Sequence, residues 1–371
     1  MHEVQIKPQW TIRQPDGTAL APRVIELLVK VLEHGSLSSA CVEAGVSYRH
    51  AWELIRQGEA MFGQPLVAMQ RGKGSSLSPL GEKLVWADRR ITARLSPLLD
   101  SLASELGAEI EKLIPSVPTL LRIHASHGFA IETLHAFLAA AQVPGDLRYC
   151  GSEEAGASLR HGGCDGAGCH VALGACEAEA VAHYGAWLDP ATQKVIGMAT
   201  RHQGLMVAPG NPKKIYTLAD LSRPDVRFIN RQAGSGTRYL FDLQLRDQGI
   251  APESIKGYEQ CEFTHAAVAA FVASGMADAG YGVETPARQF KLDFISNQVE
   301  RYFLLCEERS LAAPIVRRML DILQSEAYQG AVNRLPGYQA VNCGRVLSLP
   351  EAFESLRPVP VGKRRTATRS R

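Results

Sequence analysis

Residues 230–238, Asn-Arg-Gln-Ala-Gly-Ser-Gly-Thr-Arg, constrain the fold of this 371-residue chain more than any other stretch. They follow an apolar, strand-like run at 226–229 and lead into a helical pattern over 239–247. A strand that turns through glycines into a helix presents free backbone amides, which suit a small anion. The alternative is an ordinary strand-to-helix turn with a capping serine. The predicted anion contacts here, through guanidinium, hydroxyl and amide donors, are Arg231, Ser235, Gly236, Thr237 and Arg238.

From residue 119 onward, short strand-like runs alternate with helical patterns. Strands are expected at 120–125, 148–151 and 171–173, with loops at 168–170 and 280–282. The alternation predicts a parallel sheet with helices on both faces, in which ligands bind at the carboxyl ends of the strands. Small polar side chains at several of these ends are predicted to converge on the same anion. They are Ser126, His127, Ser152, His170, Thr264, His265 and Tyr281.

The first 62 residues contain three helical patterns, at 23–33, 38–44 and 48–61, separated by glycine-containing turns. This is the layout of a helix-turn-helix, whose last helix places its first turn against base edges in the DNA major groove. Segments 65–67 and 76–78 are expected to form a two-stranded wing. A small helical domain with solvated arginines is the alternative. The predicted DNA contacts are Ser38, Ser47, Tyr48, Arg49, His50, Arg56, Arg71 and Lys73.

A single long helix is predicted over 80–113, because leucine and isoleucine recur there at steps of three and four residues. A narrow apolar seam of this kind usually pairs with a second copy of itself, which predicts a homodimer or a dimer of dimers. The alternative is one helix packed on its own domain. Pro115 and Pro118 end the helix and indicate a hinge at 114–118.

Composition excludes several classes of protein. No run of about 18 apolar residues predicts a membrane span, and the N-terminus lacks a secretory pattern. Eight scattered cysteines fit reduced thiols, so a cytoplasmic location is expected. The net charge of +2 hides a basic tail, because residues 362–371 hold five basic and no acidic side chains. We expect this tail to be disordered and either to attract DNA or only to solubilise the chain.

Neither a metal site nor a catalytic site is predicted. The stretch 161–170 contains His161, Cys164, Cys169 and His170, but its spacing matches no zinc motif, and nothing supports a redox role for its thiols. Ser235 lies in Gly-Ser-Gly rather than in a nucleophile elbow. We therefore expect no enzyme activity and no required cofactor.

Four motifs in the N-terminal part resemble the winged helix-turn-helix of ModE-type molybdate regulators and, more distantly, the LysR-type DNA-binding domain. They are Gly35-Ser-Leu-Ser-Ser-Ala40, Ala44-Gly-Val-Ser-Tyr-Arg-His-Ala-Trp52, Arg71-Gly-Lys-Gly74 and Leu77-Ser-Pro-Leu-Gly81. The resemblance covers about residues 20–88. It implies a domain that binds double-stranded DNA.

A second resemblance covers about residues 119–345. Motifs at 228–238, 257–258, 264–270, 277–282 and 300–302 are similar to the periplasmic-binding-protein-like domain related to molybdate- and tungstate-binding transport proteins. This resemblance implies a type II, two-lobed α/β fold with crossovers near 194–206 and 290–305 and a cleft between the lobes. The family usually has Ser-His-Asp in its first loop, whereas this chain has Ser126-His127-Gly128. The departure puts the family's usual ligand in doubt.

The predicted organisation has four parts. They are an all-α winged helix-turn-helix at 1–88, a linker helix and hinge at 89–115, the α/β effector domain at 119–345 and a C-terminal segment at 346–371. The predicted function is transcription regulation controlled by a small anion, either molybdate or tungstate or a small carboxylate such as formate. The expected partners are DNA, the anion and a second copy, with no membrane. The alternative is an oxyanion-storage or molybdenum-cofactor-related protein whose helix-turn-helix only mediates association.

Overall fold

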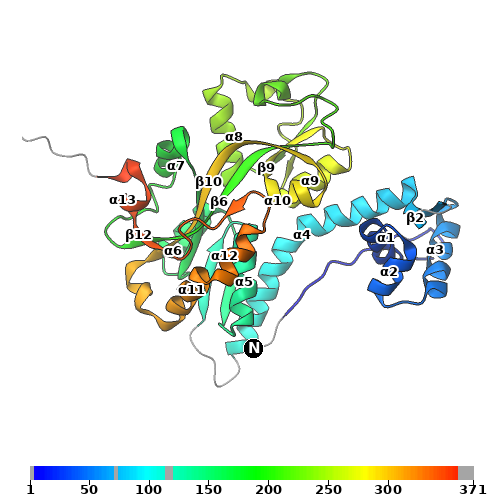
Figure 1. Ribbon diagram of the computed structural model, residues 1–371, viewed down its shortest axis with the longest axis horizontal. Coiled ribbons are helices and arrows are strands. Elements are labelled where there is room, and N and C mark those ends of the chain that lie inside the picture. The colour runs from blue at the N-terminus through cyan, green and yellow to red at the C-terminus, as the bar shows by residue number, and fades with distance from the viewer. Residues whose placement is uncertain (1–3, 71–73, 113–119, 358–371) are drawn as a thin grey trace, which may run out of the picture. The chain divides into compact units, whose positions relative to one another are not determined.

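The residues that the computed structural model describes are 4–70, 74–112 and 120–357. They form two compact units, one built from the described residues within 4–112 and 203–297 and the other from 120–202 and 298–357 (Figure 1). Several predicted features lie outside the described residues. They are the wing-tip residues Arg71 and Lys73, the hinge at 114–118 and the basic tail at 362–371.

Within the described residues, the chain passes between the two units twice, inside the strands β6 (Gln193–Val207) and β10 (Asp293–Glu307). Both passages fall within the crossover segments near 194–206 and 290–305 that the resemblance to the periplasmic-binding-protein-like domain implied. The expected fold class is confirmed: a winged helix-turn-helix precedes an α/β effector region with two lobes. Within the described ranges, no helix is long and apolar enough to cross a membrane.

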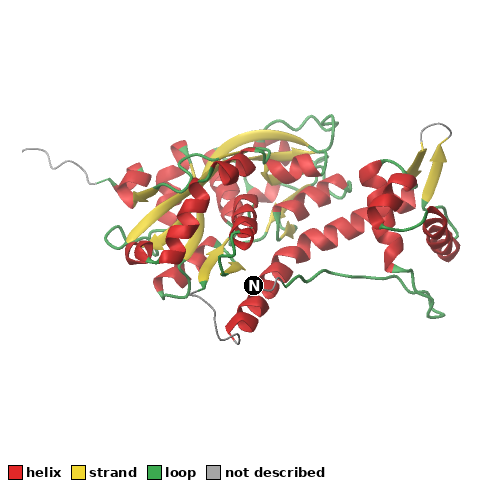
Figure 2. Cartoon of the chain, turned by 60° about the horizontal axis from the view of Figure 1, so that its bottom comes forward, coloured by secondary structure: helices red, strands yellow, loops and turns green. Residues whose placement is uncertain are grey.

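The N-terminal part of the first unit has three helices and a two-stranded wing, which Figure 2 shows beside the helices. Its elements are α1 (Pro22–His34), α2 (Leu37–Ala44), α3 (Tyr48–Phe62), β1 (Val67–Gln70) and β2 (Gly74–Leu77). Gly35, Gly45 and Gly63 end the helices with φ of 71°, 62° and 63°. This left-handed conformation favours glycine. Ser36 and Ser47 cap the following helices by accepting a hydrogen bond from a backbone amide.

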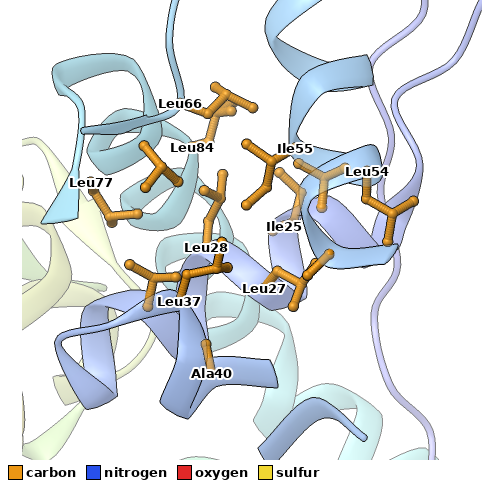
Figure 3. Close-up of a cluster of buried hydrophobic side chains, with 14 of the residues drawn as sticks. Ile25, Leu27, Leu28, Leu37, Ala40, Leu54, Ile55, Leu66, Leu77 and Leu84 are labelled. Carbon is orange, nitrogen blue, oxygen red and sulfur yellow. The ribbon is translucent and has the colours of Figure 1, made fainter. Parts of the chain in front are cut away.

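One apolar core joins the helices, the wing and the start of α4 (Pro79–Lys112), as Figure 3 shows. Leu28, Ile55 and Leu66 are completely buried in it, and Leu84 of α4 is 7% exposed. Burial of each such side chain contributes roughly 1.5–3 kcal/mol to folding. Gly81 lets α4 approach the wing, because a Cβ there would lie 2.2 Å from the carbonyl oxygen of Leu66. The wing is therefore mounted on the same core as the helices.

Helix α4 is 34 residues long and confirms the long helix that the sequence predicted. Its second half carries apolar side chains that are between 37% and 58% exposed, spaced by three and four residues. They are Leu95, Leu98, Leu102, Leu106 and Ile110. We call this set the α4 seam. Leu84 lies in the same predicted helix, but it belongs to the core described above rather than to the α4 seam.

The remainder of the first unit is a small sheet with three helices. Residues 203–207 of β6 pair antiparallel with β9 (Ala279–Val283), which lies parallel to β7 (Phe228–Arg231), and β7 lies parallel to β8 (Cys261–Glu262). The helices are α8 (Gly236–Asp247), α9 (His265–Ala273) and α10 (Glu284–Gln289). Helix α9 packs against both β9 and the linker helix α4 (Figure 1).

The loop predicted at 280–282 is wrong, because these residues lie inside the fully buried strand β9. Gly280 and Gly282 allow α9 to pack closely on this strand. A Cβ at Gly280 would lie 2.4 Å from Val268 Cγ1, and one at Gly282 would lie 2.7 Å from His265 Nδ1. The glycines therefore serve a close approach between elements rather than a turn.

The second unit contains a mixed sheet, whereas the sequence predicted a parallel one. β3 (Leu121–Ala125) lies parallel to β4 (Gly145–Tyr149) and β5 (Gly166–Ala172), but β10 pairs antiparallel with β5. The first half of β6 pairs antiparallel with β11 (Tyr338–Gln339) and β12 (Val346–Ser348). Each of these antiparallel pairs includes β6 or β10, the two strands that pass between the units.

Helices α11 and α12 pack against α5 in the second unit (Figure 1). The helices of this unit are α5 (Phe129–Ala140), α6 (Ser152–Arg160), α7 (Glu177–His183), α11 (Pro314–Gln324), α12 (Glu326–Asn333) and α13 (Leu349–Ala352). Short 3-10 helices in the described chain lie at Gly174–Cys176, Leu218–Ser222, Pro252–Ser254, Glu308–Ala312 and Glu354–Leu356.

Two strands of this unit begin earlier than the sequence predicted, at Gly145 instead of 148 and at Gly166 instead of 171. Residues 168–170, predicted as a loop, lie in β5, whose seven residues are all buried. A Cβ at Gly168 would lie 2.4 Å from the Cβ of Ala125 on β3. The glycine again permits close packing, and the composition that suggested a turn was misleading.

Candidate DNA-contact face and anion-binding residues

The predicted DNA contacts that the structure describes are all exposed on α2 and α3. They are Ser38, Ser47, Tyr48, Arg49, His50 and Arg56, and we call them the DNA-contact face. Ser47 caps α3, because its hydroxyl accepts a hydrogen bond of 3.2 Å from the backbone amide of His50. The first turn of α3 is therefore capped, and its residues Tyr48, Arg49 and His50 are exposed.

Arg49 is the most exposed charge of this face, with a side chain that is 91% exposed. Its Nε lies 3.2 Å from Glu53 Oε1, and Glu53 is itself 54% exposed. Such an exposed pair contributes about 0–1 kcal/mol, so the guanidinium can turn to another anion at little cost. Tyr48 stands edge-on to Trp52, with 6.3 Å between the ring centroids.

The wing is fixed to the helices by two polar side chains that the sequence did not single out. Ser75 of β2 accepts a hydrogen bond from the amide of Leu37, the first residue of α2. Glu59 of α3 accepts hydrogen bonds from the amides of Leu66 and Val67, at 2.9 and 3.4 Å. These bonds set the position of the wing relative to α2 and α3.

The loop between β7 and α8 contains the first group of predicted anion contacts. The helix begins at Gly236, three residues before the predicted start, and Ser235 caps it by accepting a bond of 3.1 Å from the amide of Arg238. The capping-serine alternative therefore describes the local geometry. Thr237 is 2% exposed and accepts a bond of 3.0 Å from Gln203 Nε2.

Two arginines of this loop have different surroundings. Arg231 ends β7, where its Nη2 donates to the carbonyl oxygen of Phe263 at 3.0 Å. Arg238 instead donates from Nε to both oxygens of Asp242, at 3.0 and 3.1 Å, and its guanidinium lies 4.0 Å from the Tyr258 ring centroid. The charge of Arg238 is thus compensated within α8. The i,i+4 spacing of Arg238 and Asp242 was a sequence signal for this pair.

Thr264 connects the predicted anion residues to the linker helix. It caps α9 by accepting from the amide of Ala267 at 2.9 Å, and its hydroxyl donates to the carbonyl oxygen of Ala93 in α4 at 2.8 Å. Beside it, Arg94 Nε lies 2.9 Å from Glu262 Oε2, and Glu262 is only 3% exposed. Burial raises the pKa of Glu262, although Arg94 and Arg90 act in the opposite direction.

His265 and Tyr281 are buried inside the first unit rather than placed on loops. His265 is 2% exposed, and its Nδ1 accepts from the amide of Val283 at 3.4 Å. Tyr281 is completely buried, with its hydroxyl within hydrogen-bond distance of Gln244 and Asn297. Both side chains hold helices and strands of this unit together.

The second unit brings Ser126, His127 and His170 together at the start of α5. Ser126 Oγ lies 3.4 Å from His170 Nδ1, and the Tyr302 hydroxyl donates to the carbonyl oxygen of Ser126 at 3.2 Å. His127 pairs through Nε2 with Glu132 Oε1. Ser152 is separate, because it lines a small cavity with Cys169, Val171 and Tyr184. His170 lies between those two β5 residues, so its side chain points to the other face of the strand.

A buried arginine, which the sequence did not single out, lies beside this group. Arg201 of β6 is 1% exposed, and its Nε lies 2.9 Å from Oε2 of Glu300, which is also buried. Burial lowers the pKa of Arg201, but Glu300 and Tyr338 outweigh burial, and the net pKa is raised. The sequence signal was weak, because each of the two strands contains more than one charged residue. Arg201 and Glu300 are 99 positions apart.

Cys164 and Cys169 lie in buried surroundings that do not favour thiolates. Burial raises the pKa of Cys169 to about 12 and also raises that of Cys164. A thiol of high pKa is a poor nucleophile and a poor metal ligand. In the described part of the chain, no three His, Cys, Asp or Glu side chains gather in a way that could hold a metal ion.

Two family models match this chain. Residues 136–324 match the model described as PBP superfamily domain, and residues 22–82 match the bacterial regulatory helix-turn-helix protein, lysR family. The first match covers half of the chain. The second contains α1, α2, α3 and the wing.

Among its relatives, the chain is similar to the uncharacterized protein YvgK of Bacillus subtilis (strain 168), with 37% identity over 153 residues. That match covers 41% of this chain and 49% of YvgK, so the chain spans about half the length of that relative. The molybdenum-pterin-binding protein MopB of Rhodobacter capsulatus is 29% identical over 120 residues, which cover 31% of this chain and 44% of MopB. A solved structure of Corynebacterium glutamicum OxyR aligns with a TM-score of 0.44 and 16% identity, covering 85% of this chain and 94% of OxyR.

Proposed function

We propose that this chain, which belongs to the PBP superfamily, is a LysR-type DNA-binding regulator whose effector domain binds a small anion. The observation that carries this proposal is the pairing of two sites in one chain. An exposed first turn of α3 is available to DNA, and buried donors surround the start of α5. No cofactor is required in this proposal.

DNA recognition is assigned to the DNA-contact face. Tyr48, Arg49 and His50 lie in the first turn of α3, from which side chains of a helix-turn-helix reach base edges. Ser38, Ser47 and Arg56 are suited to phosphate contacts, as are Arg71 and Lys73 by their positions in the sequence. The α4 seam supports self-association, because a second copy would cover its exposed leucines.

Three effectors are candidates: molybdate, tungstate and a small carboxylate such as formate. The match to MopB supports a molybdenum oxyanion, and the match covers less than half of that protein. The charges of two arginines in the effector region favour a monoanion. Arg201 is paired with Glu300, and Arg238 is paired with Asp242, so each guanidinium is already compensated by a carboxylate. A monoanion needs less additional positive charge than a dianion, and we therefore place formate-like carboxylates first.

The contacts of α4 in the first unit offer a route for regulation. Two residues just before α9 bind the linker helix. Thr264 donates a hydrogen bond to the carbonyl oxygen of Ala93, and Glu262 pairs with Arg94. An anion that takes the hydroxyl of Thr264 would compete with its bond to Ala93. Such competition would change how α4 is held, and with it the DNA-binding head that α4 carries. The effect is allosteric if the anion binds one state of the Thr264–Ala93 contact, formed or broken, more tightly than the other.

The proposal is tested with the full-length chain and with DNA that it selects from a random-sequence pool. Binding is followed by fluorescence anisotropy at stepped salt concentrations, with and without formate, molybdate, tungstate or sulfate. We expect affinity to fall steeply with salt and to change with one of the first three anions but not with sulfate. DNA binding that ignores every anion would contradict the proposal.

An oxyanion-storage or molybdenum-cofactor-related role is the second candidate, supported by the match to MopB. In that role the helix-turn-helix would only mediate association between copies. The same titration separates the two functions. Storage predicts anion binding without any salt-dependent binding of the selected DNA.

A further inference from the structure

Glu53 places a carboxylate beside the cationic side chains of the DNA-contact face. It lies in α3, four residues after Arg49 and three after His50, and its side chain is 54% exposed. Its Oε1 lies 3.2 Å from Nε of Arg49, and its Oε2 lies 3.8 Å from Nδ1 of His50. Residues at these spacings share one face of a helix. Glu53 therefore faces the same side of α3 as the two predicted base contacts.

A carboxylate finds few partners on DNA. When ionised it only accepts hydrogen bonds, and the phosphates of DNA are negatively charged. In the major groove, guanine presents the acceptors N7 and O6, and thymine presents the acceptor O4 and a methyl group. Adenine offers its N6 amino group beside the acceptor N7, whereas cytosine offers its N4 amino group alone. Cytosine is therefore the base edge that a carboxylate fits best.

The pair with Arg49 leaves both side chains able to bind base edges. It uses Nε of Arg49, whose side chain is 91% exposed, so the two Nη groups can donate to O6 and N7 of a guanine. Each oxygen of Glu53 has a further lone pair for an amino group. An exposed pair adds little stability, so both side chains can adjust to the DNA.

We propose that Glu53 determines sequence specificity: its carboxylate accepts a hydrogen bond from the N4 amino group of a cytosine in the major groove, next to a guanine that Arg49 binds. The inference names a base for the proposed DNA-binding function and rests on that function. Thymine is rejected at the cytosine position, because its O4 is an acceptor that faces the carboxylate. Arg49 thus adds affinity for DNA, and Glu53 excludes sequences with an acceptor at its position.

Selection of DNA from a random-sequence pool by the full-length chain tests this assignment. We expect the wild type to select a cytosine at one position close to a guanine. Glu53→Ala should lose this preference, and Glu53→Gln should shift it to adenine, whose N6 and N7 suit a side-chain amide. Glu26→Gln is the matched control, because Glu26 is 51% exposed and also lies near Nε of an arginine, but on α1. Thermal unfolding of each variant confirms that it is folded.

Fluorescence anisotropy then measures the discrimination on the selected DNA. Replacing the selected C·G pair by T·A should weaken binding of the wild type at least about fivefold. Glu53→Ala should bind the two DNAs with affinities within about twofold of each other, because it carries no carboxylate for thymine O4 to repel. Glu26→Gln should discriminate between them as the wild type does.

The outcomes separate this inference from the proposed function. A cytosine preference that Glu53→Ala removes and Glu53→Gln shifts to adenine, but that Glu26→Gln keeps, supports the assignment. Sequence preferences that neither Glu53 variant alters overturn it and leave the proposed function standing, even if these variants bind all DNA more tightly. A wild-type preference for another base at the altered position overturns the choice of cytosine. If the wild type selects no DNA, or its binding does not fall with salt, the proposed function fails as well.

Discussion

The DNA-contact face and the start of α5 use arginine in opposite ways. Arg49 on α3 is 91% exposed and pairs with an exposed glutamate, whereas Arg201 on β6 is 1% exposed and pairs with a buried one. Arginine and glutamate thus form an exposed, adjustable pair on α3 and a buried, fixed pair beside α5. The difference between the two pairs is their burial.

This difference matches the two kinds of anion that we propose. DNA presents many phosphates, and long exposed side chains can adjust to them while counterions are released. A small anion offers few atoms, so its donors must be held in position before it binds. An exposed arginine is therefore adaptable, and a buried arginine is selective. Four predictions test this contrast.

The largest expected effect is on stability. Glu300→Ala leaves Arg201 buried without its carboxylate, which should lower the free energy of unfolding by about 3–5 kcal/mol. Glu53→Ala removes the exposed partner of Arg49 and should cost less than about 1 kcal/mol. Urea unfolding followed by tryptophan fluorescence measures both. Equal losses would remove the distinction between the two pairs.

Arg49→Ala should weaken binding of the selected DNA roughly tenfold to a hundredfold, because it removes a base or phosphate contact of the first turn of α3. Its affinity for formate, measured by calorimetry, should not change. Arg246→Ala is the control, since Arg246 is also exposed and lies beside an aspartate, but on α8. DNA binding unaffected by Arg49→Ala would contradict the assigned face.

Arg231→Ala should impair the anion response and spare DNA binding, the opposite of what we expect for Arg49→Ala. We expect it to abolish the response of DNA binding to the anion, with roughly tenfold weaker anion binding, while DNA binding without anion stays intact. Thr237→Ala should act in the same direction. Arg227→Ala, an exposed arginine paired with Asp278, provides the control. If Arg49→Ala and Arg231→Ala reduce the same property equally, the interpretation as two modules is wrong.

The smallest effect concerns the buried carboxylate at the linker helix. Burial raises the pKa of Glu262 above its usual value of 4.5, so the folded chain holds this proton more tightly than the unfolded chain. The resulting stability is fully present below pH 4.5 and is lost as the pH rises through the folded pKa. Glu262→Gln should flatten this part of the pH profile of urea unfolding. A flat wild-type profile would contradict the expectation.

The helix-turn-helix could be predicted almost to the residue because its boundaries depend on neighbours in the chain. Gly35 and Gly45 end two helices, and Ser47 begins the third, as the sequence indicated. A capping bond spans three residues, and a helical face repeats within four. Ser235 was correctly considered as a cap for the same reason.

Glycine-rich stretches in the effector region were harder to interpret. Residues 168–170 and 280–282 have the composition of turns, but both lie in buried strands. Whether glycine serves a turn or close packing depends on what approaches it. For Gly168 that neighbour is Ala125, 43 positions earlier, and nothing in the local sequence identifies it.

The amino-acid sequence by itself determined the order of the elements, the exposed face of α3, the apolar seam of α4 and the two passages between the lobes. The exposed face of α3 and the apolar seam of α4 follow from spacings of a few residues, whereas the two passages were implied by the resemblance to the periplasmic-binding-protein-like domain. Only the tertiary structure decided that Arg201 meets Glu300, that Tyr338 faces Arg201 and that Thr264 binds α4. Charge pairing and burial join residues that are far apart in the chain, and such contacts exist only after the strands and helices have packed.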